Sequence, residues 1–241
     1  MTGTDAPMNG TTPTRTVERA LALLATVCSG DSPSLSECAR STDLPTSTAL
    51  RLLRTLESAD FVARDEDGLY RAGPLLLQLG ARALAQRPVV EACRPAMARL
   101  VEATGESAYL SIPGPGRTAL YVAMVEGSHS IRHTSWVGRT GPLADSAVGA
   151  ALTGQVPASG YVTMRSAIEP DVTAVAAPVR HPGGVLGALS LVGPAYRIDD
   201  VTAARYGALL AAEAAACSAV LGVPAPDPQS GPPSEMRVMN R

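Results

Sequence analysis

The sequence predicts an α+β fold with two domains, a small winged helix-turn-helix domain followed by a larger domain built on an antiparallel sheet. Residues 34–71 have the order helix, tight turn, helix and two-stranded hairpin, which is the order of a winged helix-turn-helix. After Gly105 the pattern changes to short strands separated by turns that contain Gly and Pro. A length of 241 residues also suits two domains better than one.

Composition limits both the core and the class of partner. Hydrophobic residues make up 46% of the chain but aromatic residues only 3%, so the cores must consist mainly of Leu, Val and Ala. The net charge of −2 argues mildly against a nucleic-acid partner, because DNA-binding proteins are often basic. Residues 44–56, however, contain Arg51 and Arg54 and no acidic residue. This segment therefore fits a DNA-binding protein that relies on a few specific contacts and on dimerisation.

Three helices are predicted before the hairpin. The first covers residues 16–28, where the apolar residues recur at helical spacing and share one face: Val17, Ala20, Leu21, Leu24 and Val27. The second begins after Ser34, which has capping-box spacing with Glu37. The third starts at Pro45, whose fixed φ suits a first helical turn, and ends near Ser58. Its spacing separates a buried face (Ala49, Leu52, Leu53, Leu56) from an opposite face (Ser47, Leu50, Arg51, Arg54).

The exposed face of the third helix predicts DNA binding. Small hydroxyls near its start and Arg further along are what contacts to base edges and phosphates require. An ordinary amphipathic surface helix is the alternative, and the hairpin that follows at once, with an Asp67-Gly68 turn, makes it less favoured. The hairpin tip at residues 65–67 is acidic, so phosphates would repel it. Arg64 and Arg71 at the hairpin base are better placed for phosphate contact.

The rest of the chain is predicted as a linker followed by an α+β domain. Residues 75–86 form an apolar helix that could link two domains or form a dimer, with these residues facing inward: Leu75, Leu76, Leu79, Ala83 and Leu84. Helices are also predicted at residues 89–104 and 199–221, and strands at residues 107–112, 118–126, 131–137, 173–180 and 185–192. The predicted divisions are a disordered tail (1–14), the winged helix-turn-helix (15–73), the linker helix (74–88), the second domain (89–222) and a second disordered tail (223–241).

The sequence contains no recognisable catalytic or metal-binding pattern. His129, His133 and His181 have no metal-ligand spacing with one another or with a Cys, and we interpret His129 and His133 as surface histidines. The four Cys are far apart and are interpreted as buried free thiols in a reducing cytosol. A secretory signal and a membrane-spanning run are also missing. The sequence therefore predicts a cytoplasmic protein that is not an enzyme and uses no cofactor or metal.

Several stretches together resemble a family of regulators. They are RTVERALALL, the block from residue 34 to residue 80, GESAYLS, VGRTGPLADSAVGAAL and AVAAPVRHPGGVLGALSLVGPAYRI. In this order, from about residue 15 to residue 221, they are similar to transcription factors of the isocitrate-lyase-regulator (IclR) type. The resemblance implies a C-terminal effector-binding domain of GAF-like α/β shape. It also implies a homodimer or dimer of dimers on a palindromic operator in double-stranded DNA, and a small organic acid or an apolar or aromatic effector. Repression is the commoner mode in this family.

The resemblance also implies site residues. The recognition-helix positions are Thr46, Ser47, Leu50, Arg51 and Arg54, and the effector-binding positions are Ala147, Val148, Met164, Ala174, Ser190 and Val192. Several effector positions are more apolar than the residues that hold small hydrophilic acids, which points to a more apolar or bulkier effector. The family carries a longer helical insertion where this chain has residues 149–160, so a shortened effector domain is expected.

A second hypothesis comes from a different class of protein. The chain could be a metabolite-binding or protein-interaction module that keeps the fold and has lost effector-controlled DNA binding. The acidic hairpin tip and the low net charge favour this alternative. Retention on the DNA upstream of its own gene at low salt distinguishes the two hypotheses, because a protein without DNA function would not be retained.

Overall fold

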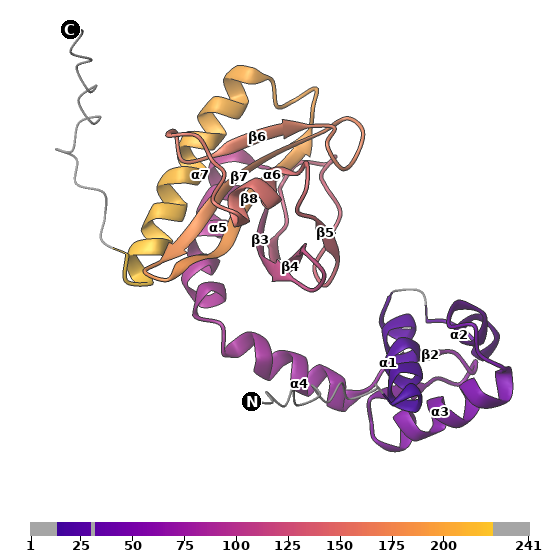
Figure 1. The fold of residues 1–241 in the computed structure, drawn as a ribbon. Coiled ribbons are helices and arrows are strands. Elements are labelled where there is room, and N and C mark those ends of the chain that lie inside the picture. The colour runs from indigo at the N-terminus through magenta and orange to yellow at the C-terminus, as the bar shows by residue number, and fades with distance from the viewer. Residues whose placement is uncertain (1–13, 30–31, 224–241) are drawn as a thin grey trace, which may run out of the picture. The chain divides into compact units, whose positions relative to one another are not determined.

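The computed structural model describes residues 14–29 and 32–223, which form two compact units divided between Ala83 and Leu84. Figure 1 labels most of their helices and strands. The tails predicted to be disordered lie outside the described residues, apart from Thr14 and Val223. No helix within the described ranges is long and apolar enough to cross a membrane. The predicted α+β class, with a winged helix-turn-helix ahead of a sheet domain, is confirmed.

The first unit has the predicted order of elements. They are α1 (Arg15–Cys28), α2 (Leu35–Ser41), α3 (Thr46–Ser58), β1 (Val62–Arg64), β2 (Tyr70–Ala72) and the start of α4 (Pro74–Ala85). The capping box at α2 is present, because the Ser34 amide donates to Glu37 Oε2 at 2.8 Å and the Glu37 amide donates to Ser34 Oγ at 3.3 Å. Strands β1 and β2 pair antiparallel, with Val62 opposite Ala72. The hairpin is tied to the helices by the Tyr70 amide, which donates to Pro33 O at 2.9 Å.

A small core holds the helices and the hairpin of this unit together. It consists of residues from α1, α2, the turn after α2, α3 and the hairpin: Leu23, Val27, Cys38, Ala39, Leu44, Ala49, Leu52, Leu53, Val62 and Tyr70. The expected inner face of α1 is partly wrong, because Val17 and Leu21 are 55% and 58% exposed. The buried stripe runs through Leu23 and Val27, and a helical repeat of 3.6 residues places Val17 and Leu21 beyond its edge. Cys28 is also exposed rather than buried.

Helix α4 differs from the prediction of an inward apolar face. It contains no buried residue among those described, and Leu79 and Leu84 are 45% and 39% exposed. Among the described residues, Leu75 and Leu76 are only half-buried, so the apolar pattern of α4 is covered in part.

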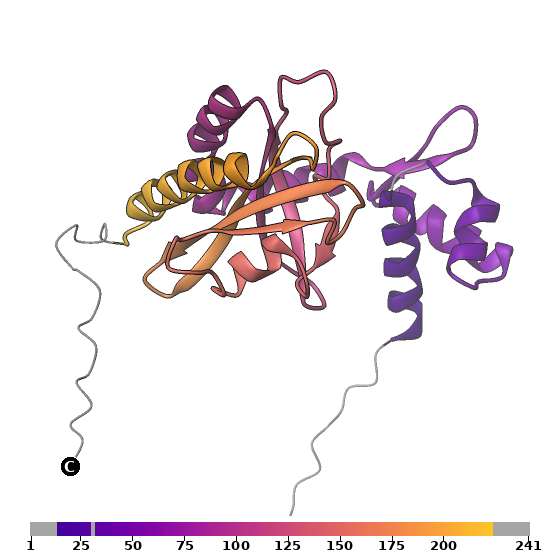
Figure 2. The same cartoon turned by 90° about the horizontal axis from the view of Figure 1, so that it is seen from above.

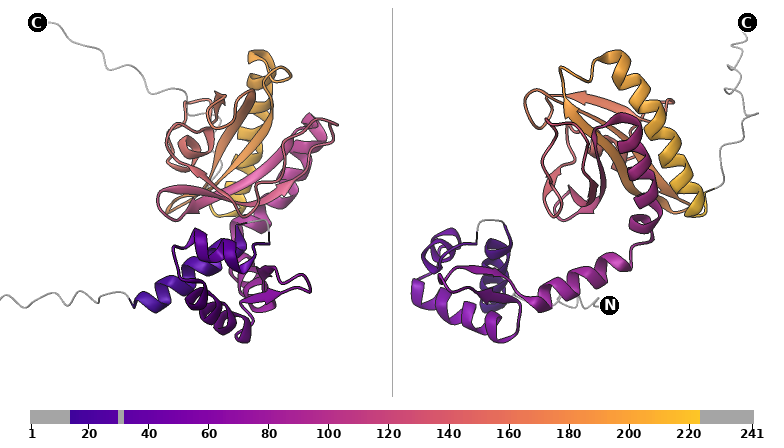
Figure 3. Two further views of the ribbon diagram at one scale, coloured as in Figure 1. Left: turned by 90° about the vertical axis from the view of Figure 1, so that its right-hand side faces the viewer. Right: turned by 180° about the vertical axis from the view of Figure 1, so that it is seen from behind.

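The second unit is a six-stranded antiparallel sheet with helices on both faces. Its elements are α5 (Pro88–Thr104), β3 (Ser107–Gly114), β4 (Thr118–Val125), β5 (Thr140–Pro142), α6 (Ala147–Leu152), β6 (Val162–Arg165), β7 (Val172–His181), β8 (Gly184–Pro194) and α7 (Asp200–Val220). The strand order is β5-β4-β3-β8-β7-β6. Figure 2 shows α5 and α7 on one face of the sheet and α6 on the other, and α5 and α7 lie side by side in Figure 3.

The two faces of the sheet carry two separate cores. Because side chains alternate along a strand, Ala108 and Leu110 of β3 pack under α5 and α7, whereas Tyr109 between them faces α6. The α5/α7 core is mainly aliphatic, and it also includes Tyr206 and two buried free thiols, Cys93 and Cys217. The α6 core is smaller and leaves a cavity.

Two strands differ from the sequence prediction. Residues 131–137 are not a strand, and the edge strand is β5 at Thr140–Pro142. The predicted strand forms no ladder because other contacts hold it: Tyr109 Oη donates to Thr134 O at 2.6 Å, and the Trp136 ring packs edge-on against Tyr121. Strand β6 at the opposite edge was not predicted, because its four residues are too short to show an alternating pattern.

Candidate functional site

The exposed face of α3 is a shallow surface formed by residues that the sequence predicts to touch DNA. Ser47, Leu50, Arg51 and Arg54 line it together with Thr55 and Ser58, which the prediction did not include. On the opposite side of the helix, Ala49 and Leu53 are completely buried. The core therefore fixes the rotation of α3, and this rotation directs both guanidinium groups to solvent. Neither Arg51 nor Arg54 forms an ion pair with a described residue, so both are free to contact phosphate or a base edge.

The remaining predicted DNA contacts have different surroundings. Thr46 is exposed at the first position of α3, and Arg71 is exposed on β2. Arg64 is held by its own hairpin, because its Nε donates to Gly68 O at 3.1 Å and its guanidinium lies 5.7 Å from the centre of the Tyr70 ring. The Asp65 carboxylate accepts a hydrogen bond from the Leu69 amide at 2.8 Å, which gives one acidic residue of the hairpin tip a role in the turn.

A cavity lies in the second unit between the sheet and α6. Met164, Ala174 and Val192 are register neighbours on β6, β7 and β8, and they form one row across the sheet. Ala147 and Val148 at the start of α6 cover this row, and all five residues line the cavity. The structure therefore brings together five of the six positions that the sequence analysis selected for effector binding.

Ser190 is the sixth position and does not line the cavity. It lies one row further along β8, opposite Tyr109 on β3 and Ala176 on β7. Its hydroxyl is buried and has no hydrogen-bond partner among the described residues. A buried hydroxyl without a hydrogen-bond partner is uncommon and destabilising. Packing alone therefore does not explain why a serine occupies position 190.

The aromatic side of the cavity comes from residues that the sequence analysis did not select. Tyr121 and Trp136 are 5.3 Å apart between ring centres and meet edge to face, and Tyr109 packs behind Tyr121 at 5.7 Å. The chain has only one Phe, one Trp and six Tyr. The clustering of three of these eight rings marks the site, but only the fold brings them together.

His133 also belongs to the cavity wall, so its interpretation as a surface histidine is wrong. Its side chain is 10% exposed, with Nδ1 2.7 Å from Tyr109 Oη and Nε2 3.3 Å from Glu169 Oε2. His129 is the more exposed of the two, at 38% of its side chain. Burial raises the pKa of Tyr109, and it raises the pKa of Tyr121 to about 12, so both phenols stay neutral over the physiological range.

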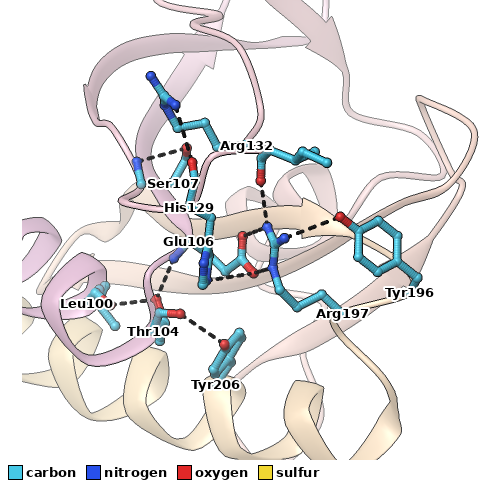
Figure 4. A network of polar contacts seen from close by, with 11 residues as sticks. Leu100, Thr104, Glu106, Ser107, His129, Arg132, Tyr196, Arg197 and Tyr206 are labelled. Atoms are coloured by element: carbon cyan, nitrogen blue, oxygen red, sulfur yellow. Dashed lines mark hydrogen bonds and ion pairs between the residues drawn. The ribbon is translucent and has the colours of Figure 1, made fainter.

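The loop that carries His133 is anchored by a buried ion pair (Figure 4). Glu106 is completely buried and accepts from Arg197 Nε at 2.5 Å and from Arg197 Nη2 at 2.8 Å. Arg197 Nη2 also donates to Ile131 O at 2.9 Å. The pair with Glu106 raises the pKa of Arg197, which keeps the guanidinium charged. The ion pair therefore joins the start of β3, the segment after β8 and the loop before His133.

Helix α6 is fixed at its start by Ser146 and Gly149. Ser146 Oγ donates to Pro142 O at 2.7 Å and accepts from the Gly149 amide at 3.0 Å. A Cβ at Gly149 would lie 1.9 Å from Leu143 O, so only glycine allows this close approach. The wall that α6 provides is therefore built before any ligand binds. The described residues contain no group of three or more His, Cys, Asp or Glu suited to a metal ion.

Comparison with known protein families gives two matches in the expected order. Residues 16–66 match the IclR helix-turn-helix domain, and residues 81–157 match the C-terminal domain of the bacterial transcriptional regulator IclR. The second match ends inside the segment that the sequence analysis expected to be shortened.

Individual proteins agree with these families. The chain is 34% identical over 138 residues to the transcriptional repressor AllR of Escherichia coli K12, covering 56% of this chain and 51% of AllR. It is 29% identical over 143 residues to the transcriptional regulator KipR of Bacillus subtilis 168, covering 59% of this chain and 57% of KipR. The chain thus spans about half the length of the curated relatives that it matches.

Solved structures show the same fold. An IclR homologue from Microbacterium hydrocarbonoxydans, complexed with 4-hydroxybenzoate, superposes with a TM-score of 0.73 at 21% identity, covering 86% of this chain and 98% of that chain. A regulator from Alicyclobacillus acidocaldarius gives a TM-score of 0.73 at 24% identity, covering 88% of this chain and 100% of that chain. At these identities the likeness establishes the fold alone.

Proposed function

Because the chain belongs to the IclR family of bacterial transcriptional regulators, we propose that it represses transcription by binding a palindromic operator as a dimer or a dimer of dimers. In this proposal α3 reads the operator in the major groove, and a small organic effector in the α6 cavity changes the affinity. The protein acts in the cytoplasm, where chromosomal DNA is accessible. AllR is named as a repressor, which supports the sign of regulation.

The observation that carries the proposal is the exposed face of α3. Arg51 and Arg54 project from a helix whose rotation is fixed by a buried face, and neither is engaged by an acidic residue within the described part of the chain. Arg in this setting can bond bidentately to guanine or contact phosphate. Leu50 on the same face offers an apolar contact for a thymine methyl group. Ser47 at the start of the helix offers a hydroxyl for either kind of contact.

The test is a binding titration on the DNA upstream of the protein's own gene, with a footprint to locate the operator. Arg51→Ala should weaken operator binding by about 1–3 kcal/mol and relax specificity at one base position. Arg94→Ala is the matched control, because Arg94 is exposed on α5 and pairs only loosely with Glu91 at 3.6 Å. Equal operator affinity for wild type and Arg51→Ala would remove this residue from the reading face.

A metabolite-binding or protein-interaction module without DNA function is the second candidate. The acidic hairpin tip favours it, because Glu66 and Asp67 are exposed and would repel phosphates. This candidate predicts that the chain is not retained on its upstream DNA even at low salt, while small molecules still raise its melting temperature. Retention that weakens steeply with added salt would exclude it.

A further inference from the structure

The α6 cavity combines an aromatic wall with an aliphatic floor. Tyr121 and Trp136 stand edge to face on one side, and aliphatic and thioether side chains cover the remainder: Val148, Met164, Ile168, Val172 and Val192. The cavity has a volume of about 40 Å³. This small volume argues against a large ring system, and the apolar walls favour an apolar ligand over a hydrated one.

The charges at this cavity are unfavourable for an anion. Glu169 is the acidic residue among the described lining residues, which include no Arg, and the whole chain contains no Lys. His133 is already engaged at both ring nitrogens, by Tyr109 and by Glu169. His133 therefore faces an acidic partner and offers the cavity no unpaired basic group. A carboxylate in this cavity would find no Arg or Lys side chain among the described lining residues.

The charges at the mouth of the cavity are also unfavourable for an anion. An outer groove shares His133, Glu169 and Val172 with the cavity, so a ligand that enters on this side passes the Glu169 carboxylate. Arg132 lines the groove, but its Nε pairs with Glu126 Oε1 at 2.6 Å and its Nη1 donates to His129 O at 3.2 Å. The cation nearest in sequence to His133 is therefore already neutralised by an acidic partner.

We propose that the effector is a small aromatic alcohol or amine without a carboxylate. This inference rests on the proposed effector function and narrows its ligand class from the organic acids that the sequence resemblance allowed. The ring packs against Tyr121 and Trp136, and the hydroxyl or ammonium donates to the Glu169 carboxylate, of which one oxygen already faces His133. An ammonium group also gains from the faces of the aromatic rings.

Three probes that share the 4-hydroxyphenyl ring and carry a neutral, a positive or a negative substituent test this proposal on the full chain: 4-hydroxybenzyl alcohol, 4-hydroxybenzylamine and 4-hydroxybenzoate. Calorimetry measures the affinities, and the emission of Trp136, the only Trp in the chain, reports whether the cavity is occupied. The alcohol and the amine should bind at least about tenfold more tightly than the benzoate, because like charges in a partly exposed site repel. Benzoate that binds as tightly as the alcohol overturns the proposal, and so does a failure of all three probes at millimolar concentration.

The variant Glu169→Gln tests whether the Glu169 carboxylate causes the preference for the alcohol over the benzoate. Glu169→Gln should bring the affinity for benzoate to within about threefold of that for the alcohol, because the amide removes the repulsion and keeps the shape. Glu102→Gln is the control, since Glu102 is exposed on α5 and lies outside the cavity lining. Unchanged selectivity in Glu169→Gln would contradict the role of this carboxylate. These titrations contain no DNA, so a failure here is separate from a failure of operator binding, which the footprint measures alone.

Discussion

Removal of the Arg197 side chain should destabilise the second unit strongly, because it leaves a charge buried without its partner. Glu106 is completely buried and receives two hydrogen bonds from Arg197, at 2.5 and 2.8 Å. In Arg197→Ala the remaining cationic candidate near this carboxylate among the described residues is His129, whose Nε2 lies 3.8 Å from Glu106 Oε1. Breaking a buried ion pair by truncating one partner costs about 3–5 kcal/mol, and we expect a loss in this range.

Urea unfolding followed by Trp136 fluorescence measures this loss. Trp136 is the only Trp and lies in the second unit, so the signal does not mix with unfolding of the first unit. The double variant Glu106→Gln/Arg197→Ala should recover part of the stability, because a neutral amide avoids the unpaired charge. Arg94→Ala serves as the surface control and should change stability by no more than about 0.5 kcal/mol, because both partners of its ion pair are mostly exposed.

Two results would refute this reasoning about the ion pair. A loss below about 1 kcal/mol in Arg197→Ala would mean that water or another group replaces the guanidinium without cost. A double variant that is no more stable than Arg197→Ala would mean that the loss comes from packing and not from the charge of Glu106.

Four further predictions concern other parts of the chain. Gly149→Ala should lower the stability of the second unit by about 1–3 kcal/mol in thermal unfolding, because the added Cβ would clash with the backbone oxygen of Leu143, 1.9 Å away. An unchanged melting temperature would show that α6 can move freely. Burial raises the pKa of Tyr121 to about 12, so the unfolded chain loses this proton first, and the free energy of unfolding should fall by about 2 kcal/mol as the pH rises from 10 to 12. Alkaline urea titrations should show a smaller fall in Tyr121→Phe, and an equal fall would contradict the assignment. Ser34→Ala should destabilise the first unit by about 1 kcal/mol through loss of the α2 cap. The hydrogen bonds from Ser34 lower the pKa of Glu37. The stability that Glu37 contributes is therefore complete above its ordinary pKa of 4.5 and disappears as the pH falls through the lowered pKa. Glu37→Gln should remove this pH dependence in acid unfolding curves.

The first unit could be predicted well from sequence because its signals are local. The capping box at Ser34, the separation of α3 into two faces and the turn at Gly68 each depend on residues within a few positions of one another. Local patterns were less reliable where an apolar residue at helical spacing stays exposed instead of entering the core. Val17 and Leu21 on α1, like Leu79 and Leu84 on α4, repeat at helical spacing but remain exposed among the described residues.

The cavity could be predicted only in part. Resemblance to a family placed Met164, Ala174 and Val192 near an effector, and the register of β6, β7 and β8 explains why residues so far apart in sequence meet. Whether they contact an effector stays a prediction. The aromatic wall was missed because Trp136 lies in a segment that alternates like a strand, and its true contacts are with a ring from β4. Such contacts depend on the fold and leave no periodic signal in the sequence.

The division of the sheet into two cores has a consequence for how ligand specificity can change. Along β8, Ala188 and Val192 belong to the core beneath α6, and Leu189 and Leu191 belong to the core beneath α5 and α7. Substitutions at alternate positions can therefore reshape the cavity while the intervening residues continue to hold the two long helices. The same strands can evolve toward new small molecules without rebuilding the scaffold that supports them. A library confined to the α6 side should accordingly yield variants with new ligand preferences and nearly unchanged melting temperatures.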